Sequence, residues 1–303
     1  MAVTATGDRT PDAFGTVGVL GAGVIGLGVA ADLALHGFRV ILVDHDPAQI
    51  DSAPARLAEA ARIAPMLRPG FPASADRATA AVRVGTDPGA LAECTLVVEN
   101  VTERLDVKED VYRLLDTVVA DTAVVAVNTS SIPVARLAAH LSRPERVIGV
   151  HFMNPPYLTA AVEVMRPDRT CDETFARVGE LAALLRKKTI VIGDFPGFVS
   201  NRVSHLFFNE AARVVEEHGV APETVDRIFR DCFGHRMGPL QTADLIGLDT
   251  VVHTLDHLRD ATGDPRFESC ALLRDMVGRR QLGRKTDRGF YAYQPYPARE
   301  VPS

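Results

Sequence analysis

Val17-Gly18-Val19-Leu20-Gly21-Ala22-Gly23-Val24-Ile25-Gly26 decides how the first part of the chain folds. An apolar strand runs here directly into a turn that contains three glycines. Gly21 allows the sharp turn, Gly23 lets the backbone approach a pyrophosphate, and Gly26 lets the following helix pack on the strand. The N–H groups at the start of that helix then face the phosphates. The stretch therefore predicts a dinucleotide site, and we expect Val24 and Ile25 to belong to it with the glycines.

Asp44 closes the next apolar run, Val40–Val43, about 20 residues beyond the glycines. A carboxylate at this place accepts hydrogen bonds from the ribose hydroxyls and repels a 2′-phosphate. His45 follows, where an arginine would favour the phosphorylated cofactor. The sequence therefore predicts NAD rather than NADP.

Length and composition limit the class of protein. A chain of 303 residues has room for about two domains, and 47% hydrophobic with 24% charged residues is ordinary for a globular protein. The net charge of −6 offers no general reason to expect nucleic acid or a membrane surface as partner. No apolar stretch approaches the roughly 18 residues of a membrane-spanning helix.

The N-terminal segment and the cysteines carry no targeting or metal signal. Residues 1–14 have no apolar core, so we expect a flexible tail rather than a signal peptide and a cytoplasmic protein. The four cysteines are far apart and match neither a zinc-ligand spacing nor a disulfide framework. We interpret them as buried or incidental thiols, and we expect no metal.

Apolar strands and helices alternate over residues 15–195, which predicts an α/β domain with a Rossmann-type, doubly wound and mainly parallel sheet. An alanine-rich helix over residues 48–64 leaves the sheet after Asp44, and Pro65 and the prolines that follow are expected to break it. From residue 196 the pattern is helical to the end of the chain, which predicts an all-α domain for dimerisation and substrate binding. Its few helices cannot bury all their apolar faces alone, so a homodimer is expected.

Polar residues that suit oxidation chemistry lie at or near predicted strand ends, where parallel sheets bind ligands. Asn128 and Ser130 follow one strand, and His151 lies in the next. Glu163 is the polar member of an apolar run and is costly to bury unless it is paired. A His151–Glu163 pair would supply a base for an alcohol proton, with the carboxylate fixing the tautomer.

Plainer explanations remain open for these residues. A strand histidine is often a core residue whose hydrogen bonds are satisfied, and Ser130 is equally suited to cap the helix expected near Pro133. Asn201 lies in the first turn of a long helix, where a local hydrogen bond explains it. The pattern alone does not choose between these explanations and catalysis.

Several segments together resemble the L-3-hydroxyacyl-CoA dehydrogenase family, and the resemblance runs from Gly15 to Tyr293. They are Asn128-Thr129-Ser130-Ser131, Gly149-Val150-His151-Phe152-Met153-Asn154-Pro155, Val162-Glu163-Val164, Pro196-Gly197-Phe198-Val199-Ser200-Asn201-Arg202, Met237 through Asp249, and Leu282-Gly283-Arg284-Lys285-Thr286. The resemblance implies NAD-dependent oxidation of a 3-hydroxyacyl thioester.

The same resemblance implies roles for single residues. His151 is expected to be the catalytic base with Glu163 as its partner, while Ser130 and Asn201 bind and polarise the oxygen atoms of the substrate. Five further positions match residues that contact the cofactor or its nicotinamide end in the family. They are Glu103, Lys108, Asn128, Asn154 and Lys285.

The carrier of the acyl group stays open. Family members that use CoA place a serine and several lysines on the helix after Asp44, whereas no lysine occurs here between Asp44 and Lys108. Arg56, Arg62 and Arg68 can still bind phosphates. The resemblance extends to members of polyketide extender-unit pathways that oxidise a glyceryl group toward hydroxymalonyl on an acyl carrier protein, an acidic partner that suits scattered arginines. CoA and a carrier protein are both expected candidates.

Two other functions compete with this one. A dehydrogenase of a free polar hydroxy acid, such as gulonate or carnitine, shares the architecture, although the segment from Cys232 to Asp249 is closer to the acyl-thioester branch. An NAD-binding interaction protein without catalysis is the alternative from another class. The joint presence of Ser130, His151, Glu163 and Asn201 argues against it.

Overall fold

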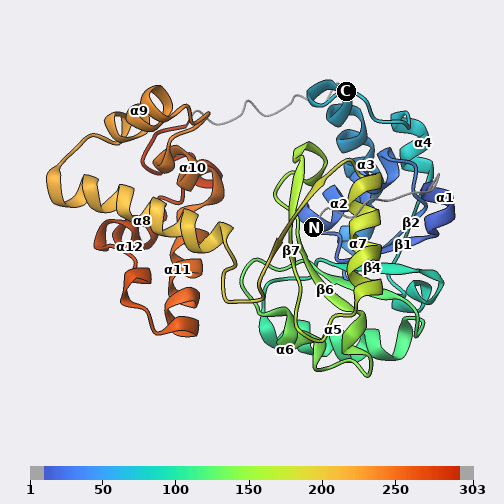
Figure 1. The fold of residues 1–303 in the computed structure, drawn as a ribbon. Coiled ribbons are helices and arrows are strands. Elements are labelled where there is room, and N and C mark those ends of the chain that lie inside the picture. Colours follow the sequence, from blue (N-terminus) through green and yellow to red (C-terminus); the bar gives the residue numbers. More distant parts are fainter. Residues whose placement is uncertain (1–9, 294–303) are drawn as a thin grey trace. The chain divides into compact units, whose positions relative to one another are not determined.

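The computed structural model describes residues 10–293, and the chain divides into two compact units between Phe195 and Pro196. The first unit holds all eight strands of one sheet, in the order β3-β2-β1-β4-β5-β6-β7-β8 (Figure 1). The strands are β1 (Val17–Leu20), β2 (Val40–Val43), β3 (Val82–Gly85), β4 (Leu96–Glu99), β5 (Val124–Val127), β6 (Val147–His151), β7 (Ala161–Met165) and β8 (Lys188–Ile192).

The sheet is parallel except where β7 runs against β6. β6 and β7 are joined by a short segment that contains only the 3₁₀ turn η3 (Pro156–Leu158). A parallel connection needs a crossover of a dozen or more residues, so this short link reverses the chain. The reversal puts His151 directly opposite Glu163 in the strand register.

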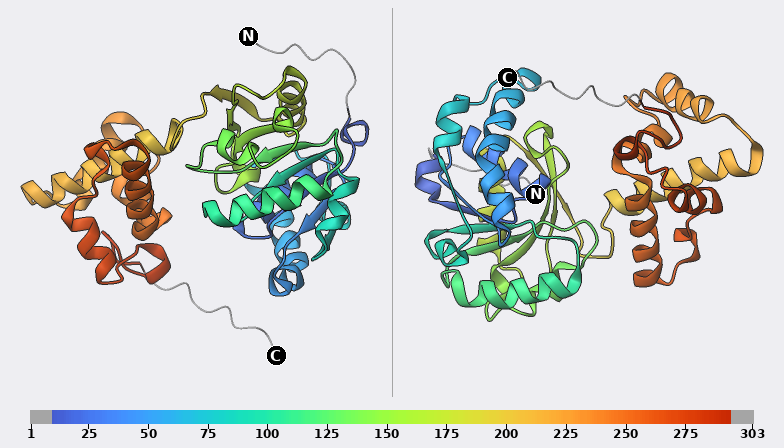
Figure 2. Two further views of the ribbon diagram at one scale, coloured as in Figure 1. Left: turned by 90° about the horizontal axis from the view of Figure 1, so that it is seen from below. Right: turned by 180° about the vertical axis from the view of Figure 1, so that it is seen from behind.

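Helices cover the sheet on both faces (Figure 2). One core joins the sheet to α2 (Val24–Leu35), α3 (Pro47–Leu67) and α7 (Asp172–Leu184), through alternate strand residues such as Val17 and Val19. The remaining helices of this unit are α1 (Pro11–Phe14), α4 (Ala75–Ala80), α5 (Leu105–Val118) and α6 (Val134–Ala138), with 3₁₀ turns at Pro88–Glu93 and Pro144–Arg146. The predicted fold class, a doubly wound sheet followed by a helical domain, is confirmed.

The second unit contains helices and no strand of the sheet in its described part, Pro196 to Tyr293. Its core is formed by apolar side chains of these helices, including Leu240, Val251 and Leu273. The helices are α8 (Ser200–His218), α9 (Pro222–Phe233), α10 (Pro239–Ile246), α11 (Leu248–Thr262) and α12 (Ala271–Gly278), with 3₁₀ turns at Pro265–Phe267 and Arg284–Thr286.

The expectation of a flexible tail over residues 1–14 is wrong for its last residues. Thr10 caps helix α1 by accepting a hydrogen bond from the Ala13 N–H at 3.3 Å. Phe14 is buried, with its ring edge-to-face on Phe38 and the Arg177 guanidinium 3.5 Å from its centroid. Burial of the Phe14 ring against Phe38 and Arg177 explains why residues 10–14 pack on the first unit. Residues 1–9 lie outside the described part of the chain.

The expectation that Pro65 breaks the helix after Asp44 is also wrong. Helix α3 passes through Pro54 and Pro65 and ends at Leu67. A proline inside a helix costs about 3 kcal/mol because it removes a hydrogen bond. The helix buries a continuous stripe of small and apolar residues, Ala53, Leu57, Ala60, Ala61 and Ala64, whose packing offsets that cost.

Candidate active site

The glycine turn connects β1 to α2 at the carboxyl edge of the sheet. A Cβ atom on Gly26 would lie 1.9 Å from the carbonyl oxygen of Gly21, so the helix and the turn approach each other too closely for any other residue. A Cβ atom on Gly23 would meet nothing within 4 Å. Gly23 therefore leaves open space in front of the N–H groups that begin α2, as a bound pyrophosphate requires.

Asp44 joins this turn to the end of β2. Its Oδ2 accepts a hydrogen bond from the Ala22 N–H at 2.6 Å, and its Oδ1 accepts one from the Asp46 N–H at 2.9 Å. Gly21, Gly23 and Asp44 line one cavity of about 680 Å³, which is large enough for the adenosine half of a dinucleotide. Its lining continues through Leu20, Val43, His45, Asp46, Gln49, Thr86, Pro88, Asn100, Val101, Thr102, Val107, Asp110, Val111 and Leu114.

Val24 and Ile25 do not lie together. Val24 is exposed and lines a second cavity of about 310 Å³, whereas Ile25 packs against the core of the first unit. Asn154, which follows β6, lines the same second cavity. The two predicted cofactor residues Val24 and Asn154 thus come from the start of α2 and the end of β6 to one place.

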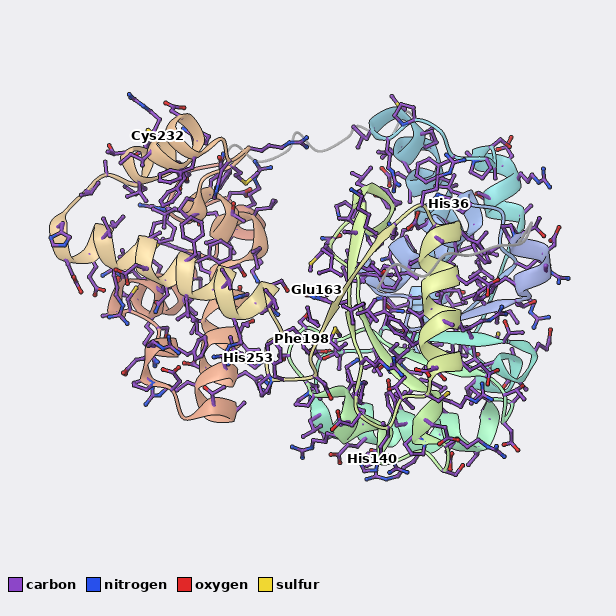
Figure 3. The ribbon with its side chains drawn as sticks, viewed as in Figure 1. His36, His140, Glu163, Phe198, Cys232 and His253 are labelled. Carbon is purple, nitrogen blue, oxygen red and sulfur yellow. The ribbon has the colours of Figure 1, made fainter. Side chains whose placement is uncertain are left out.

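His151 and Glu163 form the buried pair that their residue types suggested. His151 Nδ1 lies 2.9 Å from Glu163 Oε2, and both residues are only 7% exposed. Figure 3 marks Glu163 on β7. Ser130 Oγ lies 3.4 Å from the other ring nitrogen, His151 Nε2. The carboxylate can hold the Nδ1–H tautomer, which directs the basic Nε2 toward Ser130.

Glu103 is bonded to the turn that carries Ser130. Its Oε1 accepts hydrogen bonds from Thr129 Oγ1 at 2.6 Å, the Ser130 N–H at 2.7 Å and the Ser131 N–H at 3.0 Å. Helix α6, which begins after this turn, is capped by Asp194, whose two carboxylate oxygens each accept a backbone N–H at 2.7 Å. The structure therefore assigns the cap of α6 to Asp194 rather than to Ser130.

Asn128 ties three strand ends together. Its Nδ2 donates to Asn100 Oδ1 at 2.8 Å after β4, and its Oδ1 accepts from the Phe152 N–H at 3.1 Å after β6. Asn128 itself follows β5. Asn100 was not among the predicted site residues, although its place directly after an apolar strand is the same signal that pointed to Asn128.

Lys108, which is predicted to contact the cofactor, already has partners inside the first unit. Lys108 is fully buried, and its Nζ donates to both carboxylate oxygens of Glu99, at 2.8 and 2.9 Å, and to the carbonyl oxygen of Asn128 at 3.0 Å. An ammonium has three N–H groups, so these contacts use them all. Lys108 faces the core because it shares one side of α5 with Tyr112 and Leu115.

Glu99 is a further residue that the sequence did not reveal. It is the last residue of β4, fully buried, and its Oε1 also accepts the Val101 N–H at 2.7 Å. Burial raises the pKa of Glu99, and the Lys108 ammonium opposes that rise. The pair therefore supports the loop after β4 that lines the first cavity.

Asn201 and Lys285 belong to the second unit. Asn201 lies in the first turn of α8, and its carbonyl oxygen lies 3.1 Å from His205 Nδ1. Lys285 Nζ forms an ion pair with Asp249 at 2.5 Å. The site residues of the first unit, His151, Glu163 and Ser130, lie together.

Within residues 10–293 no group of three or more His, Cys, Asp or Glu side chains is arranged to hold a metal ion. Cys94 and Cys270 are buried free thiols, Cys171 is half-buried, and Cys232 is exposed. No helix in this part of the chain is both long and apolar enough to cross a membrane.

Two family models match almost the whole described chain. Residues 16–195 match the model described as 3-hydroxyacyl-CoA dehydrogenase, NAD binding domain, and residues 197–293 match 3-hydroxyacyl-CoA dehydrogenase, C-terminal domain.

Similar proteins include a probable 3-hydroxybutyryl-CoA dehydrogenase of Deinococcus radiodurans, 39% identical over 91% of this chain and 99% of the relative. A second relative, 5-formyl-3-hydroxy-2-methylpyridine 4-carboxylate 5-dehydrogenase of Mesorhizobium japonicum, is 32% identical over 92% of this chain and 91% of its own length. Among solved structures, (S)-3-hydroxybutyryl-CoA dehydrogenase of Ralstonia eutropha superposes with a TM-score of 0.86 at 36% identity, covering 92% of this chain and 99% of that one.

Proposed function

The chain belongs to the 3-hydroxyacyl-CoA dehydrogenase family and is an NAD-dependent oxidoreductase acting on a CH–OH group, and we propose that it oxidises a short 3-hydroxyacyl thioester to the 3-ketoacyl thioester. The observation that carries the proposal is the buried His151–Glu163 pair, 2.9 Å apart, with Ser130 beside the second ring nitrogen. It supplies a base next to a hydroxyl donor, as alcohol oxidation requires.

His151 is the proposed base. Its Nε2 takes the proton from the substrate hydroxyl while the C–H bond of the same carbon gives up a hydride. NAD, held by the glycine turn and Asp44, would supply the acceptor for that hydride. Glu163 accepts the Nδ1–H throughout and stabilises the imidazolium once the ring carries both protons. Ser130 and, by resemblance, Asn201 bind and polarise the oxygen atoms of the substrate.

The first unit supplies most of the proposed cofactor site. Gly23 leaves room for the pyrophosphate at the start of α2, while Gly21 and Gly26 allow the close packing of the turn. Asp44 would accept hydrogen bonds from the ribose hydroxyls. Glu103, Asn128, Asn154 and Lys285 remain proposed contacts near the nicotinamide end. Lys108 stays a proposed contact as well, and its Nζ also binds Glu99 and the Asn128 carbonyl oxygen.

We propose CoA as the first candidate for the acyl carrier, because the relative from Deinococcus radiodurans and the similar structure from Ralstonia eutropha are named for a CoA thioester. An acyl carrier protein is the second candidate. Met66 and Leu67 at the end of α3 are exposed, Arg62 and Arg77 lie exposed near them in the chain, and no lysine occurs between Asp44 and Lys108. An apolar surface with arginines suits an acidic protein partner.

One kinetic comparison tests the function and the carrier together. NADH absorbance is followed with the same short 3-hydroxyacyl group on CoA, on an acyl carrier protein and as the free acid, and kcat/KM is compared. We expect the CoA thioester to be the best substrate. A higher kcat/KM on the carrier protein would reverse the order of the two carriers. Turnover of the free hydroxy acid alone would contradict a thioester substrate.

We also propose that the protein is a homodimer formed through its second unit. Ile228 and Phe233 on α9 and Leu245 and Ile246 on α10 are exposed apolar side chains. Patches of this kind on a small helical unit are commonly covered by a partner. A second copy of the chain is the proposed partner.

A further inference from the structure

The turn between β5 and α6 is held by a carboxylate that comes from outside the turn. Thr129, Ser130 and Ser131 all bond to a single oxygen atom, Oε1 of Glu103, at 2.6, 2.7 and 3.0 Å. Two of these donors are backbone N–H groups, so the carboxylate fixes the path of the chain and not only a side chain. A charged acceptor makes such hydrogen bonds about twice as strong as neutral ones.

The neighbouring hydrogen bonds fix other parts of this region. Within the turn, Thr129 Oγ1 accepts the Ile132 N–H at 3.0 Å. The helix that follows is capped by Asp194 and not by residues of the turn. Glu103 is therefore the acceptor that ties the Ser130 backbone to the loop after β4.

Glu103 is itself placed by the buried pair beneath it. Lys108 Nζ lies 3.8 Å from Glu103 Oε2 and donates to the carbonyl oxygen of Asn128, the residue just before the turn. Glu99 binds the same ammonium and the Val101 N–H, on the loop that leads to Glu103. The loop after β4 and the turn after β5 are thus joined by one set of charged groups.

We infer that Glu103 is a positioning residue, which holds the Thr129–Ser131 turn so that the Ser130 hydroxyl faces His151 Nε2 at 3.4 Å. The inference rests on the proposed function, since Ser130 matters only if it binds the reacting oxygen. It goes further by giving Glu103 a task in addition to its proposed cofactor contact. A displacement of about 1 Å at a catalytic group can cost about 100-fold in rate.

The test compares Glu103→Ala and Glu103→Gln, each made with Ser130 present and in a Ser130→Ala background. The rate with saturating 3-hydroxybutyryl-CoA and NAD gives kcat, and calorimetry gives the Kd for NAD. We expect Glu103→Ala to lower kcat at saturating NAD at least about 10-fold, a loss separate from any change in the NAD Kd that its proposed cofactor contact brings. Glutamine keeps an acceptor oxygen, so Glu103→Gln should recover most of the loss.

The Ser130→Ala background separates positioning from other roles. If Glu103 acts through Ser130, then Glu103→Ala should change kcat less than about 3-fold in the Ser130→Ala background. The effects of substitutions at coupled residues do not add. An equally large loss in both backgrounds would overturn the inference. So would a loss that saturating NAD abolishes, which would make Glu103 a cofactor contact only.

A measurement that needs no turnover keeps the inference separate from the proposed function. Hydrogen exchange at the Ser130 and Ser131 amides should speed up in Glu103→Ala relative to the wild type, because both N–H groups lose their acceptor. Unchanged hydrogen exchange at these two amides would refute the role of Glu103 in holding the turn, even if the enzyme is active. If the wild-type protein is inactive on every thioester, the proposed function is refuted. Hydrogen exchange at the Ser130 and Ser131 amides then still tests whether Glu103 holds the turn.

Discussion

At the scale of single residues, the site depends on which polar groups are buried together. Glu163 is enclosed by a strand of apolar neighbours and faces His151 Nδ1. A buried carboxylate without a partner costs several kcal/mol, so the pair is favoured by folding as well as by chemistry. The charge of Glu163 therefore both stabilises the pair and orients the proposed base.

His151→Ala should lower kcat at least about 100-fold, the usual contribution of a general base, while NAD still binds. Stopped-flow or steady-state NADH absorbance with a 3-hydroxyacyl-CoA measures the effect. His140→Ala is the matched control, because His140 is a half-buried histidine that lies near Glu109 and apart from Glu163 (Figure 3). Near wild-type turnover in His151→Ala would remove His151 from the mechanism.

Residue patterns predicted part of this site. The pairing of His151 with Glu163 followed from the cost of burying a carboxylate, and the structure places the two in contact. Lys108 was expected at the cofactor because its position matches a cofactor-contacting position of the family that the sequence resembles. Its spacing from Tyr112 and Leu115 on one helix face was the signal that it points inward. Glu99 gave no such signal, since only the fold brings it to Lys108.

At the scale of elements, the glycine turn shows that glycines of one motif serve different purposes. Gly26 is required by packing between α2 and the turn, while Gly23 faces open space. Gly23 also has an extended backbone that other residues adopt easily. Gly26 is therefore needed for folding, whereas Gly23 is needed for binding the ligand.

Alanine substitutions should separate these roles. Gly26→Ala should lower the unfolding free energy by about 1–3 kcal/mol or more, because its Cβ overlaps the Gly21 carbonyl. Gly23→Ala should leave the unfolding free energy within about 0.5 kcal/mol of the wild-type value. It should weaken NAD binding at least about 10-fold. Urea unfolding and NAD calorimetry measure both quantities. Equal loss of stability in the two variants would contradict the distinction.

Helix α8 contains a histidine that links its stability to pH. Burial lowers the pKa of His205 to about 4, from 6.5 when unfolded, although its contact with the Asn201 carbonyl opposes the shift. Between these values the unfolded chain binds the extra proton and the folded chain does not, so stability falls as the pH drops from 6.5 toward 4. The loss approaches about 3 kcal/mol at pH 4.

Unfolding of the second unit, followed in urea from pH 7 to pH 4, should show this loss in the wild type and a flatter profile in His205→Gln. His253→Gln, at an exposed position on α11 (Figure 3), should keep the wild-type profile. If the unfolding free energy falls equally with pH in all three proteins, His205 is not the group responsible for the loss of stability.

At the scale of the whole molecule, the fold class was the most predictable property. Strand and helix periods alternate so regularly that the parallel sheet and the helical second unit followed from pattern alone. The direction of β7 was not predicted, although the short link after β6 excludes a parallel crossover. The docking of Phe14 and the unbroken helix α3 escaped prediction because tertiary packing decides both.

The proposed homodimer gives a prediction at this scale. Phe233→Glu should convert the dimer to monomers in light scattering, because a charge replaces a ring that is 67% exposed in the single chain. Met66→Glu, at a 78% exposed apolar position of the first unit, should leave the mass unchanged. A wild-type protein that is monomeric at micromolar concentration would contradict the proposal.

The antiparallel pairing of β6 and β7 has a consequence for how this enzyme can diversify. His151 and Glu163 face each other across one backbone ladder, so the register of β6 and β7 brings them together. Neither member of the pair lies in residues 152–160, which join the two strands, or in α3. We therefore expect that mutations which leave the register of β6 and β7 intact can change the acyl carrier or acyl group while the proposed proton-accepting pair is kept.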